Sequence, residues 1–182
     1  LQEAALALNI ASVKEIVARS RLETANAESA LAELLNTRSL ILLEAGIPTT
    51  DSDLLLMARR QWNELQEKIT QTIESYHQNY PLRRGIPREE LKSKLKLSTR
   101  AFNAILNKLI TDHSLTEYSA VLAKPEHEVR FDNGQAAKVK ALMQKFEQNP
   151  YSPPSVRELQ AEVNEETLNA LIESGSLVAV SP

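Results

Sequence analysis

Basic residues are concentrated in one short segment of the chain, residues 83–100. This segment holds seven lysines and arginines against Glu89 and Glu90, a net charge of +5, whereas the whole chain has a formal net charge of −3. A concentrated positive patch on an acidic protein can bind the phosphates of a nucleic acid in a salt-dependent way. The candidate phosphate contacts are Arg83, Arg84, Arg88, Lys92, Lys94, Lys96 and Arg100.

The same charges are also compatible with a solvated helix face whose side chains pair with one another. Glu90 and Lys94 are spaced i, i+4, which places opposite charges side by side on a helix. Both interpretations stay open, because helix-turn-helix proteins often keep only a scaffold role.

Other chemistry has little support in the sequence. The chain has no cysteine and only four glycines, which argues against disulfides, thiolate metal sites and a glycine-rich phosphate loop. His77, His113 and His127 are separated from one another and from any carboxylate cluster, so we expect no metal site. No serine, histidine and acid arrangement marks a nucleophile, so we expect no catalytic residues, no enzymatic activity and no cofactor in this chain.

Two aromatic residues and three helix patterns bear on nucleic-acid binding. Trp62 and Tyr76 can be read as stacking platforms for bases, but their place on an amphipathic stripe favours packing between modules. A helix that enters the major groove needs hydrogen-bond donors and positive charge. The first and third candidate helices carry Glu28, Glu33, Glu165, Glu166 and Glu173, and only the second has suitable residues, namely Arg100, Asn103, Asn107 and Lys108. An array that reads DNA is therefore not expected.

These three helices belong to an internal repeat. Apolar residues at i, i+3, i+4 spacing are followed five residues later by a leucine that opens a short apolar stretch. The three copies are Leu31, Leu34, Leu35 and Leu40; Leu106, Leu109, Ile110 and Leu115; and Leu168, Leu171, Ile172 and Leu177. Their spacing of 75 and then 62 residues predicts three modules of about 60 residues each.

The first module is predicted over residues 1–58. Ser12 and Glu15 have the spacing of a capping box, so a helix is expected to begin at Val13. A second amphipathic helix follows, and residues 40–43 have the apolar pattern of a strand. Helices followed by a β-hairpin are typical of a winged-helix domain.

The second module is predicted over residues 59–131. An amphipathic pattern without glycine or proline predicts a connector helix over residues 53–80 that enters this module. Pro87 is suited to the first turn of the next helix, and Ser98 or Thr99 can cap the helix after it. The wing is predicted as two strands, residues 117–123 and 127–131, joined by a turn through residues 124–126.

The third module is predicted over residues 132–182. Its helices are expected over 133–148, 155–163 and 165–174, with a break at residues 149–154 and with Gly175 as a left-handed C-terminal residue. Residues 177–180 resemble the first strand of a wing that the chain does not complete. The predicted fold is mainly α with small β wings, as three tandem winged-helix domains in an elongated array.

The segment from residue 77 to residue 95, HQNYPLRRGIPREELKSKL, resembles the second winged helix in the C-terminal half of the bacterial selenocysteine-specific elongation factor family, SelB. The positions that match the family motif are His77, Pro81, Leu82, Arg83, Gly85, Glu89, Glu90 and Leu91. The other two modules resemble the family by pattern rather than by distinctive residues.

The resemblance implies a translation GTPase that carries selenocysteinyl-tRNA to the ribosome at a recoded UGA codon. Its C-terminal extension is four tandem winged helices, the last of which binds the selenocysteine insertion hairpin in the mRNA. The chain resembles the first three, so we interpret it as a monomeric fragment of a longer protein. GTP and magnesium are then expected in an N-terminal half that this sequence lacks.

Within such a parent, the three modules are expected to be a spacer between the GTPase half and the terminal RNA-binding module. Movement at the junctions near residues 132 and 150 would transmit the engagement of RNA to the GTPase half. No apolar run approaches the about 18 residues of a membrane span, so we expect a cytoplasmic protein without membrane association. The alternative is a DNA-binding or protein-interaction winged-helix array of a transcription or chromosome-segregation factor.

Overall fold

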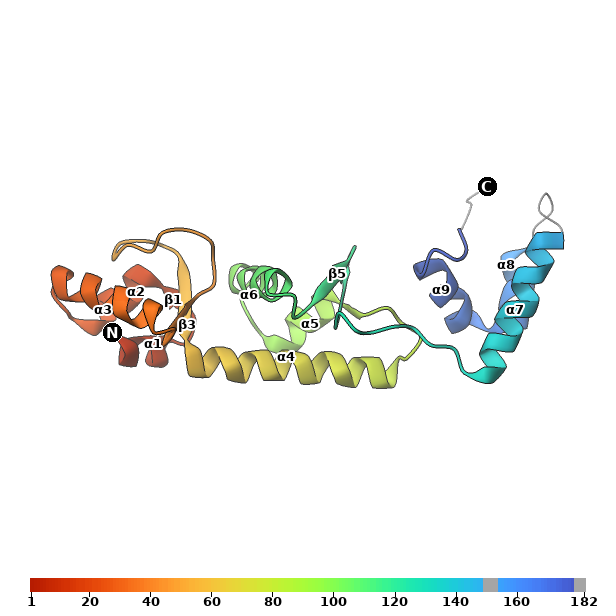
Figure 1. The fold of residues 1–182 in the computed structure, drawn as a ribbon, viewed down its shortest axis with the longest axis horizontal. Coiled ribbons are helices and arrows are strands. Elements are labelled where there is room, and N and C mark those ends of the chain that lie inside the picture. Colours follow the sequence, from red (N-terminus) through yellow and green to blue (C-terminus); the bar gives the residue numbers. More distant parts are fainter. Residues whose placement is uncertain (149–153, 179–182) are drawn as a thin grey trace. The chain divides into compact units, whose positions relative to one another are not determined.

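The structure, a computed structural model, describes residues 1–148 and 154–178. It divides into two compact units, one made of Leu1–Thr72 with Arg88–Thr116 and the other of Ile73–Pro87 with the residues from Glu117 onward. Helices predominate among the described residues and the strands are short (Figure 1). The predicted mainly α-helical fold with small sheets is confirmed, whereas the three tandem domains and their elongated arrangement stay predictions.

The first module has the order of elements of a winged helix. Helices α1 (Gln2–Leu8), α2 (Val13–Ser20) and α3 (Thr24–Asn36) combine with strands β1 (Ala11–Ser12), β2 (Leu40–Leu42) and β3 (Leu55–Ala58). The strands form an antiparallel sheet in the order β1-β3-β2. The register places Ser12 opposite Leu55 and Leu42 opposite Leu56.

Helix α2 begins where the sequence predicts. Ser12 Oγ accepts a hydrogen bond from the Glu15 N–H at 3.4 Å, and the Glu15 carboxylate accepts one from the Ser12 N–H at 2.8 Å. This reciprocal pair satisfies donors that a helix N-terminus leaves unpaired. The hydrogen bonds from Ser12 also hold the pKa of the Glu15 carboxyl below its ordinary value. The predicted capping box is therefore confirmed.

The repeated apolar residues build the core of this module. Leu31 is 4% exposed and lies in a cluster with Ala5, Val13, Ile16 and Leu56. Leu34 and Leu35 are partly buried against the same cluster. Full burial of one such side chain contributes about 1.5–3 kcal/mol.

Residues 53–58 are not helical, so the predicted connector helix of residues 53–80 is wrong at its beginning. Leu55–Ala58 form β3, the central strand of the sheet, and all four residues are buried. Helix α4 starts only at Arg59 and ends at Asn79. A central strand buried on both faces is apolar throughout, and hydrophobic periodicity does not distinguish it from a buried helix.

The second module contains α4 (Arg59–Asn79), β4 (Ile86–Pro87), α5 (Arg88–Leu95), α6 (Thr99–Thr111), β5 (Thr116–Tyr118) and β6 (Val121–Ala123). Ser98 caps α6 as predicted, because its Oγ accepts the Ala101 N–H at 3.3 Å. Pro87 is not the first residue of α5 but belongs to β4, where it lies opposite Val121. β4 is an edge strand in the order β4-β6-β5, a place where the missing N–H of proline is tolerated.

The wing of the second module is shorter than predicted. Its turn lies between β5 and β6, where Ser119 has a left-handed φ of 57°, and not at residues 124–126. A turn does follow there, with the His127 N–H donating to the Lys124 carbonyl at 3.0 Å, but residues 127–131 form no strand. β6 already pairs with β4 on one side and β5 on the other, so it has no free edge with which residues 127–131 could pair.

The third module contains α7 (Asn133–Gln148), α8 (Val156–Val163) and α9 (Glu165–Glu173). Ser155 and Glu158 form a second capping box at the start of α8. The buried cluster consists of Leu142, Leu159, Val163, Leu168 and Leu171. Gly175 has a φ of 77°, which confirms the predicted left-handed residue.

Two predictions for the third module fall largely outside the described residues. The predicted break at residues 149–154 lies there except for residue 154, and so does the second half of the predicted strand at residues 177–180. Residues 177 and 178 are described and form no strand.

Two histidines that are far apart in the sequence stack on each other. The ring centroids of His77 and His127 are 3.5 Å apart with an interplanar angle of 16°. The ion pair between Lys124 and Glu74, at 2.7 Å, holds the segment before His127 on α4. The prediction that these histidines are separated is therefore wrong, because the turn after β6 returns the chain to α4.

This stack leaves His77 in an unusual electrostatic environment. Both of its ring nitrogens are buried without a hydrogen-bond partner in the described part of the chain. Burial, together with the neighbouring His127, lowers the pKa of His77 to about 4.

The first testable prediction concerns Gly85, one of the residues of the family motif. A Cβ atom at this position would lie 2.4 Å from the Leu122 carbonyl oxygen. Gly85→Ala is expected to lower the free energy of unfolding by about 1–3 kcal/mol, since backbone must move. The control is Gly134→Ala in the first turn of α7, where an added Cβ meets only the Asp132 side chain at 3.3 Å, so the free energy of unfolding should change by no more than about 0.5 kcal/mol. Urea unfolding followed by circular dichroism measures both, and an unchanged midpoint for Gly85→Ala would contradict the close approach.

The second prediction concerns the pH dependence of stability. The His77 pKa is 6.5 in an unperturbed chain and about 4 in the fold, so the unfolded state gains a proton first as the pH falls. The free energy of unfolding should therefore decline between pH 6.5 and pH 4 and be highest above this window. His77→Phe, which keeps a stacking ring without a titrating group, should flatten the decline. The exposed control His113→Phe should leave it unchanged, and equal slopes for His77→Phe and the unaltered chain would refute the assignment.

Candidate nucleic-acid interface

The seven candidate phosphate contacts do not lie within one compact unit. Arg83 and Arg84 belong to the second unit, and the other five, Arg88, Lys92, Lys94, Lys96 and Arg100, belong to the first. Their environments differ, and each unit is therefore described by itself.

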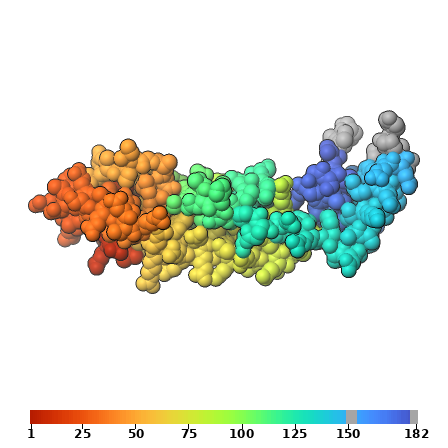
Figure 2. Space-filling model, viewed as in Figure 1, coloured from red at the N-terminus to blue at the C-terminus, as the bar shows by residue number. Residues whose placement is uncertain are grey.

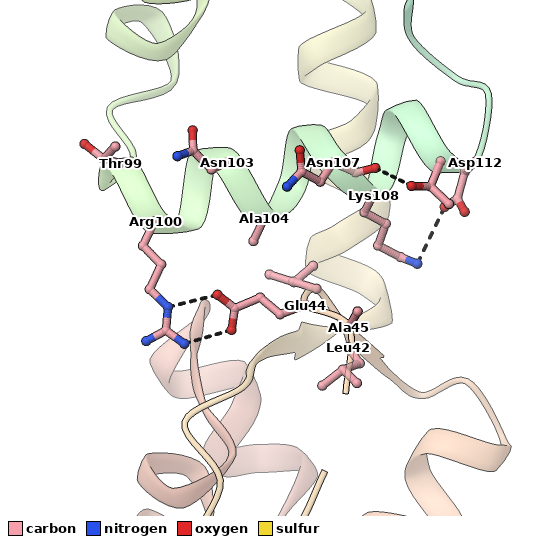
Figure 3. A pocket seen from close by; sticks show the side chains of 12 residues that line it. Leu42, Glu44, Ala45, Thr99, Arg100, Asn103, Ala104, Asn107, Lys108 and Asp112 are labelled. Atoms are coloured by element: carbon pink, nitrogen blue, oxygen red, sulfur yellow. Dashed lines mark hydrogen bonds and ion pairs between the residues drawn. The ribbon is translucent and has the colours of Figure 1, made fainter. Parts of the chain in front are cut away.

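Arg100, near the start of α6, is engaged by acidic and carbonyl oxygens of the first module. Its Nε and Nη2 donate to the two carboxylate oxygens of Glu44 at 2.9 and 2.8 Å (Figure 3). Nη2 also donates to the Asp53 carbonyl at 2.7 Å. Such a two-point guanidinium–carboxylate contact is among the strongest hydrogen-bonded arrangements in proteins. We call this contact the Arg100–Glu44 fork.

The fork is tied to the sheet of the first module. Glu44 also accepts the Leu55 N–H at 2.9 Å, and Asp53 pairs with Lys14 at 2.6 Å. The hydrogen bond from Arg100 is the main reason that the pKa of the Glu44 carboxyl lies below its ordinary value. In the space-filling view, the segment 40–58, coloured orange, lies directly against α6, coloured green (Figure 2).

A groove of about 770 Å³ runs between α6 and the end of β2. Figure 3 shows its polar wall on α6 and its opposite wall around Glu44. The α6 side chains that line it include those that the sequence singles out, Arg100, Asn103, Asn107 and Lys108. The predicted recognition face of α6 is thus assembled, but it faces residues 42–45 of the same unit.

The two cations of this groove already have acidic partners. Arg100 is held in the fork, and Lys108 lies 3.6 Å from Asp112. A helix that reads a duplex needs a face free to enter the major groove. The polar face of α6 opens onto a groove whose opposite wall is residues 42–45 of the same unit, which argues against duplex reading here.

The remaining cations of the first unit lie on or after α5. Lys92 and Lys94 pair with Glu89 and Glu90 at 3.6 and 3.2 Å, so the predicted Glu90–Lys94 pair is confirmed. Lys96 is exposed and has no carboxylate partner among the described residues. Arg88 donates to the Asn103 side chain at 2.9 Å.

In the second unit, Arg84 connects the motif segment with α9. Its guanidinium lies 3.6 Å from the centroid of the Tyr118 ring, and its Nη1 donates to the Glu173 carbonyl at 3.2 Å. Arg83 donates to the Tyr76 hydroxyl at 3.1 Å and lies over the Tyr80 ring. Glu173, predicted only as a charge that disfavours DNA, is therefore a partner of the motif.

The other motif residues act mainly in packing. Leu82 and Leu91 are 6% and 0% exposed, and Gly85 allows the close approach to Leu122. His77 stacks on His127, whereas Pro81 is exposed.

The structure also bears on residues considered for other roles. Trp62 and Tyr76 are 4% and 3% exposed, so neither presents a ring face for stacking on bases. Within residues 1–148 and 154–178, no cluster of three or more histidine, cysteine or acidic residues is placed to hold a metal ion. No helix in the described part of the chain is long and apolar enough to span a membrane.

Sequence reasoning missed several partners that the fold brings to these cations. Glu44 and Asp53 come from the first wing, and Tyr118 comes from the second. No spacing rule connects them with Arg100 or Arg84, because the contacts join residues far apart in the chain.

Comparison with known families identifies one part of the chain. No curated protein sequence matches the chain. Residues 70–123 match the family model described as elongation factor SelB, winged helix. This match spans the motif segment, α5, α6 and the short wing, which are the elements that the geometry describes as a winged helix. Residues 70–123 are therefore similar to a winged-helix domain of the SelB elongation factors, in agreement with the resemblance of the motif segment.

Proposed function

We propose that the chain is the winged-helix spacer of a selenocysteine-specific elongation factor. In this proposal it links the half that binds GTP, magnesium and selenocysteinyl-tRNA to a terminal module that binds the mRNA insertion hairpin. It acts in the cytoplasm, on the ribosome, and performs no catalysis itself. The modules set the distance between the hairpin and the site where the tRNA is delivered.

The observation that carries this proposal is the Arg100–Glu44 fork. It joins α6 of the second module to the wing of the first, and both lie in one compact unit. A spacer transmits position only if its modules do not tumble independently, and a bidentate contact fixes orientation as well as distance. The fork thus supports a mechanical role.

The position of the polar face of α6 opposite residues 42–45 supports the same role over the alternative of a DNA-binding array. The polar residues that would read bases face residues 42–45. We therefore assign hairpin recognition to a module outside this chain. Contacts of the present modules with RNA are then independent of RNA sequence.

The contact between Arg84 and Glu173 supports a role for the later junction. It joins the motif segment of the second module to the end of α9 in the third. An RNA phosphate that attracted Arg84 would compete with this contact. Engagement of RNA would in this way be coupled to movement near residues 132 and 150.

A spin-label experiment tests the fork. Because the chain has no cysteine, Glu28→Cys in α3 and Ser93→Cys in α5 provide two unique labelling sites, both exposed. The distance distribution between the labels is expected to be narrow, and Arg100→Met should broaden it. The control Arg60→Met breaks only an exposed pair with Glu64 and should leave it narrow. A broad distribution in the chain with intact Arg100 would contradict a spacer role.

An RNA-binding experiment tests the assignment of hairpin recognition. Fluorescence anisotropy with a labelled insertion hairpin and a scrambled hairpin, at low and physiological salt, should give similar affinities. The ratio of the two affinities, insertion hairpin over scrambled hairpin, is expected to lie far below the roughly 10³-fold difference that separates specific from non-specific binding. Discrimination of that size would place hairpin reading within these modules and overturn the spacer assignment.

A further inference from the structure

A pair of arginines outside the family motif shares one corner of the first unit. Arg38 directly follows α3, and Arg59 is the first residue of α4. The β2–β3 ladder, which places Leu40 opposite Ala58, brings them together. Arg59 Nε donates to the Arg38 carbonyl at 2.9 Å, and the Arg59 N–H donates to the Ser39 carbonyl at 2.9 Å.

Both arginines border two hollows of the surface. One hollow, of about 870 Å³, is lined by Thr37, Arg38, Ser39 and Arg59, with further residues of α1 and α4 that include Glu67 and the Arg60–Glu64 pair. The other, of about 560 Å³, is lined by the same two arginines together with Trp62 and Lys108. A chain-like ligand that passes from one hollow to the other would therefore have both arginines along its path.

The charges of this pair are not neutralised in the fold. Within the described residues, neither Arg38 nor Arg59 forms an ion pair with a carboxylate, and the Arg38 guanidinium and both Nη groups of Arg59 make no hydrogen bond. Nearby cations differ, since Arg60 pairs with Glu64 at 2.9 Å and Lys108 lies 3.6 Å from Asp112. The donors of the arginine pair thus face solvent beside the two hollows.

The backbone adds to this arrangement. Arg38 has a left-handed φ of 57°, a conformation that glycine or asparagine adopts at lower cost. The bond from Arg59 Nε to the Arg38 carbonyl helps to hold that conformation. The hydroxyl groups of Thr37 and Ser39 lie 3.1 Å apart on either side of Arg38 in the sequence. Thr37 is exposed and Ser39 is partly exposed.

We propose that Arg38 and Arg59 bind the phosphate backbone of an RNA. Guanidinium groups match phosphate oxygens by two parallel hydrogen bonds, and hydroxyl groups are common additional phosphate partners. Such contacts position a nucleic acid without reading its sequence. Only the choice of RNA as the polyanion rests on the proposed function; the anion site follows from the arginine pair.

The test uses a fluorescein-labelled single-stranded RNA of 12 nucleotides, unrelated to any hairpin, titrated by anisotropy over a range of salt concentrations. Arg38→Gln with Arg59→Gln should weaken binding about tenfold, which equals about 1.4 kcal/mol. It should also reduce the slope of log K against log salt by about 1.4, since each lost phosphate contact on a single strand removes about 0.7.

The control variant removes two cations elsewhere in the same unit. Arg19→Gln with Lys68→Gln makes the same change in net charge at exposed positions without carboxylate partners among the described residues. It should weaken binding less than the test variant. Equal losses in both variants, or no RNA binding by the unaltered chain at low salt, would overturn the proposal.

Two further arms keep the result interpretable. Arg38→Lys with Arg59→Lys keeps the charge but not the planar donors, so it should retain the salt slope and lose only part of the affinity. Inorganic phosphate should compete only weakly with RNA, and a polyglutamate peptide should bind more weakly than RNA. Phosphate that displaces RNA at equal concentration, or tighter binding of polyglutamate through the same arginines, would assign the site to free phosphate or to an acidic protein instead. The experiment with the two hairpins tests the spacer role separately, and its result does not affect the test of Arg38 and Arg59.

Discussion

The arrangement of the first unit depends on the contact between Arg100 and Glu44. The carboxylate accepts two guanidinium hydrogen bonds and one from the Leu55 N–H, so it ties α6 to the backbone of the central strand β3. Because the arginine also donates to the Asp53 carbonyl, its position is fixed from both sides of the loop between β2 and β3. This ion pair thus holds the start of α6 next to the loop between β2 and β3.

This constraint changes the meaning of the positive charge in the chain. The segment 83–100 is the most basic by sequence, yet most of its cations hold acidic, aromatic or amide side chains of the fold. Transfer of a paired cation to a phosphate breaks its pair with the acid, which costs up to about 1 kcal/mol for an exposed pair. Arg38 and Arg59 carry no such cost, which supports the proposal that this less conspicuous pair binds an anion.

The family motif is explained mainly by packing and by one junction. Gly85 lets two backbone segments meet, Leu82 and Leu91 fill the interior, and His77 stacks on His127. Arg84, which lies in the same segment but is not one of the matched positions, reaches beyond its own module to Glu173 at the end of α9. A motif of this kind specifies how one domain folds and how it meets the next, which agrees with a spacer that reads no sequence.

Local interactions are what the sequence determined by itself. The capping pair of Ser12 and Glu15, the cap at Ser98 and the left-handed Gly175 involve neighbours within a few residues, and their spacing is therefore visible in the chain. The helical character of the chain and the SelB-type second module followed from the same local patterns and from the motif.

Only the tertiary structure decided the features that depend on pairing across the chain. β3 replaced the start of a predicted helix because both of its edges and faces are covered by partners, and the wing strand at residues 127–131 was lost because β6 was already paired on both sides. The partners of Arg100, Arg84 and His77 likewise come from distant segments. Hydrophobic periodicity indicates which residues are buried. Which distant residue each of them contacts depends on the path of the backbone, and that path cannot be predicted from local spacing.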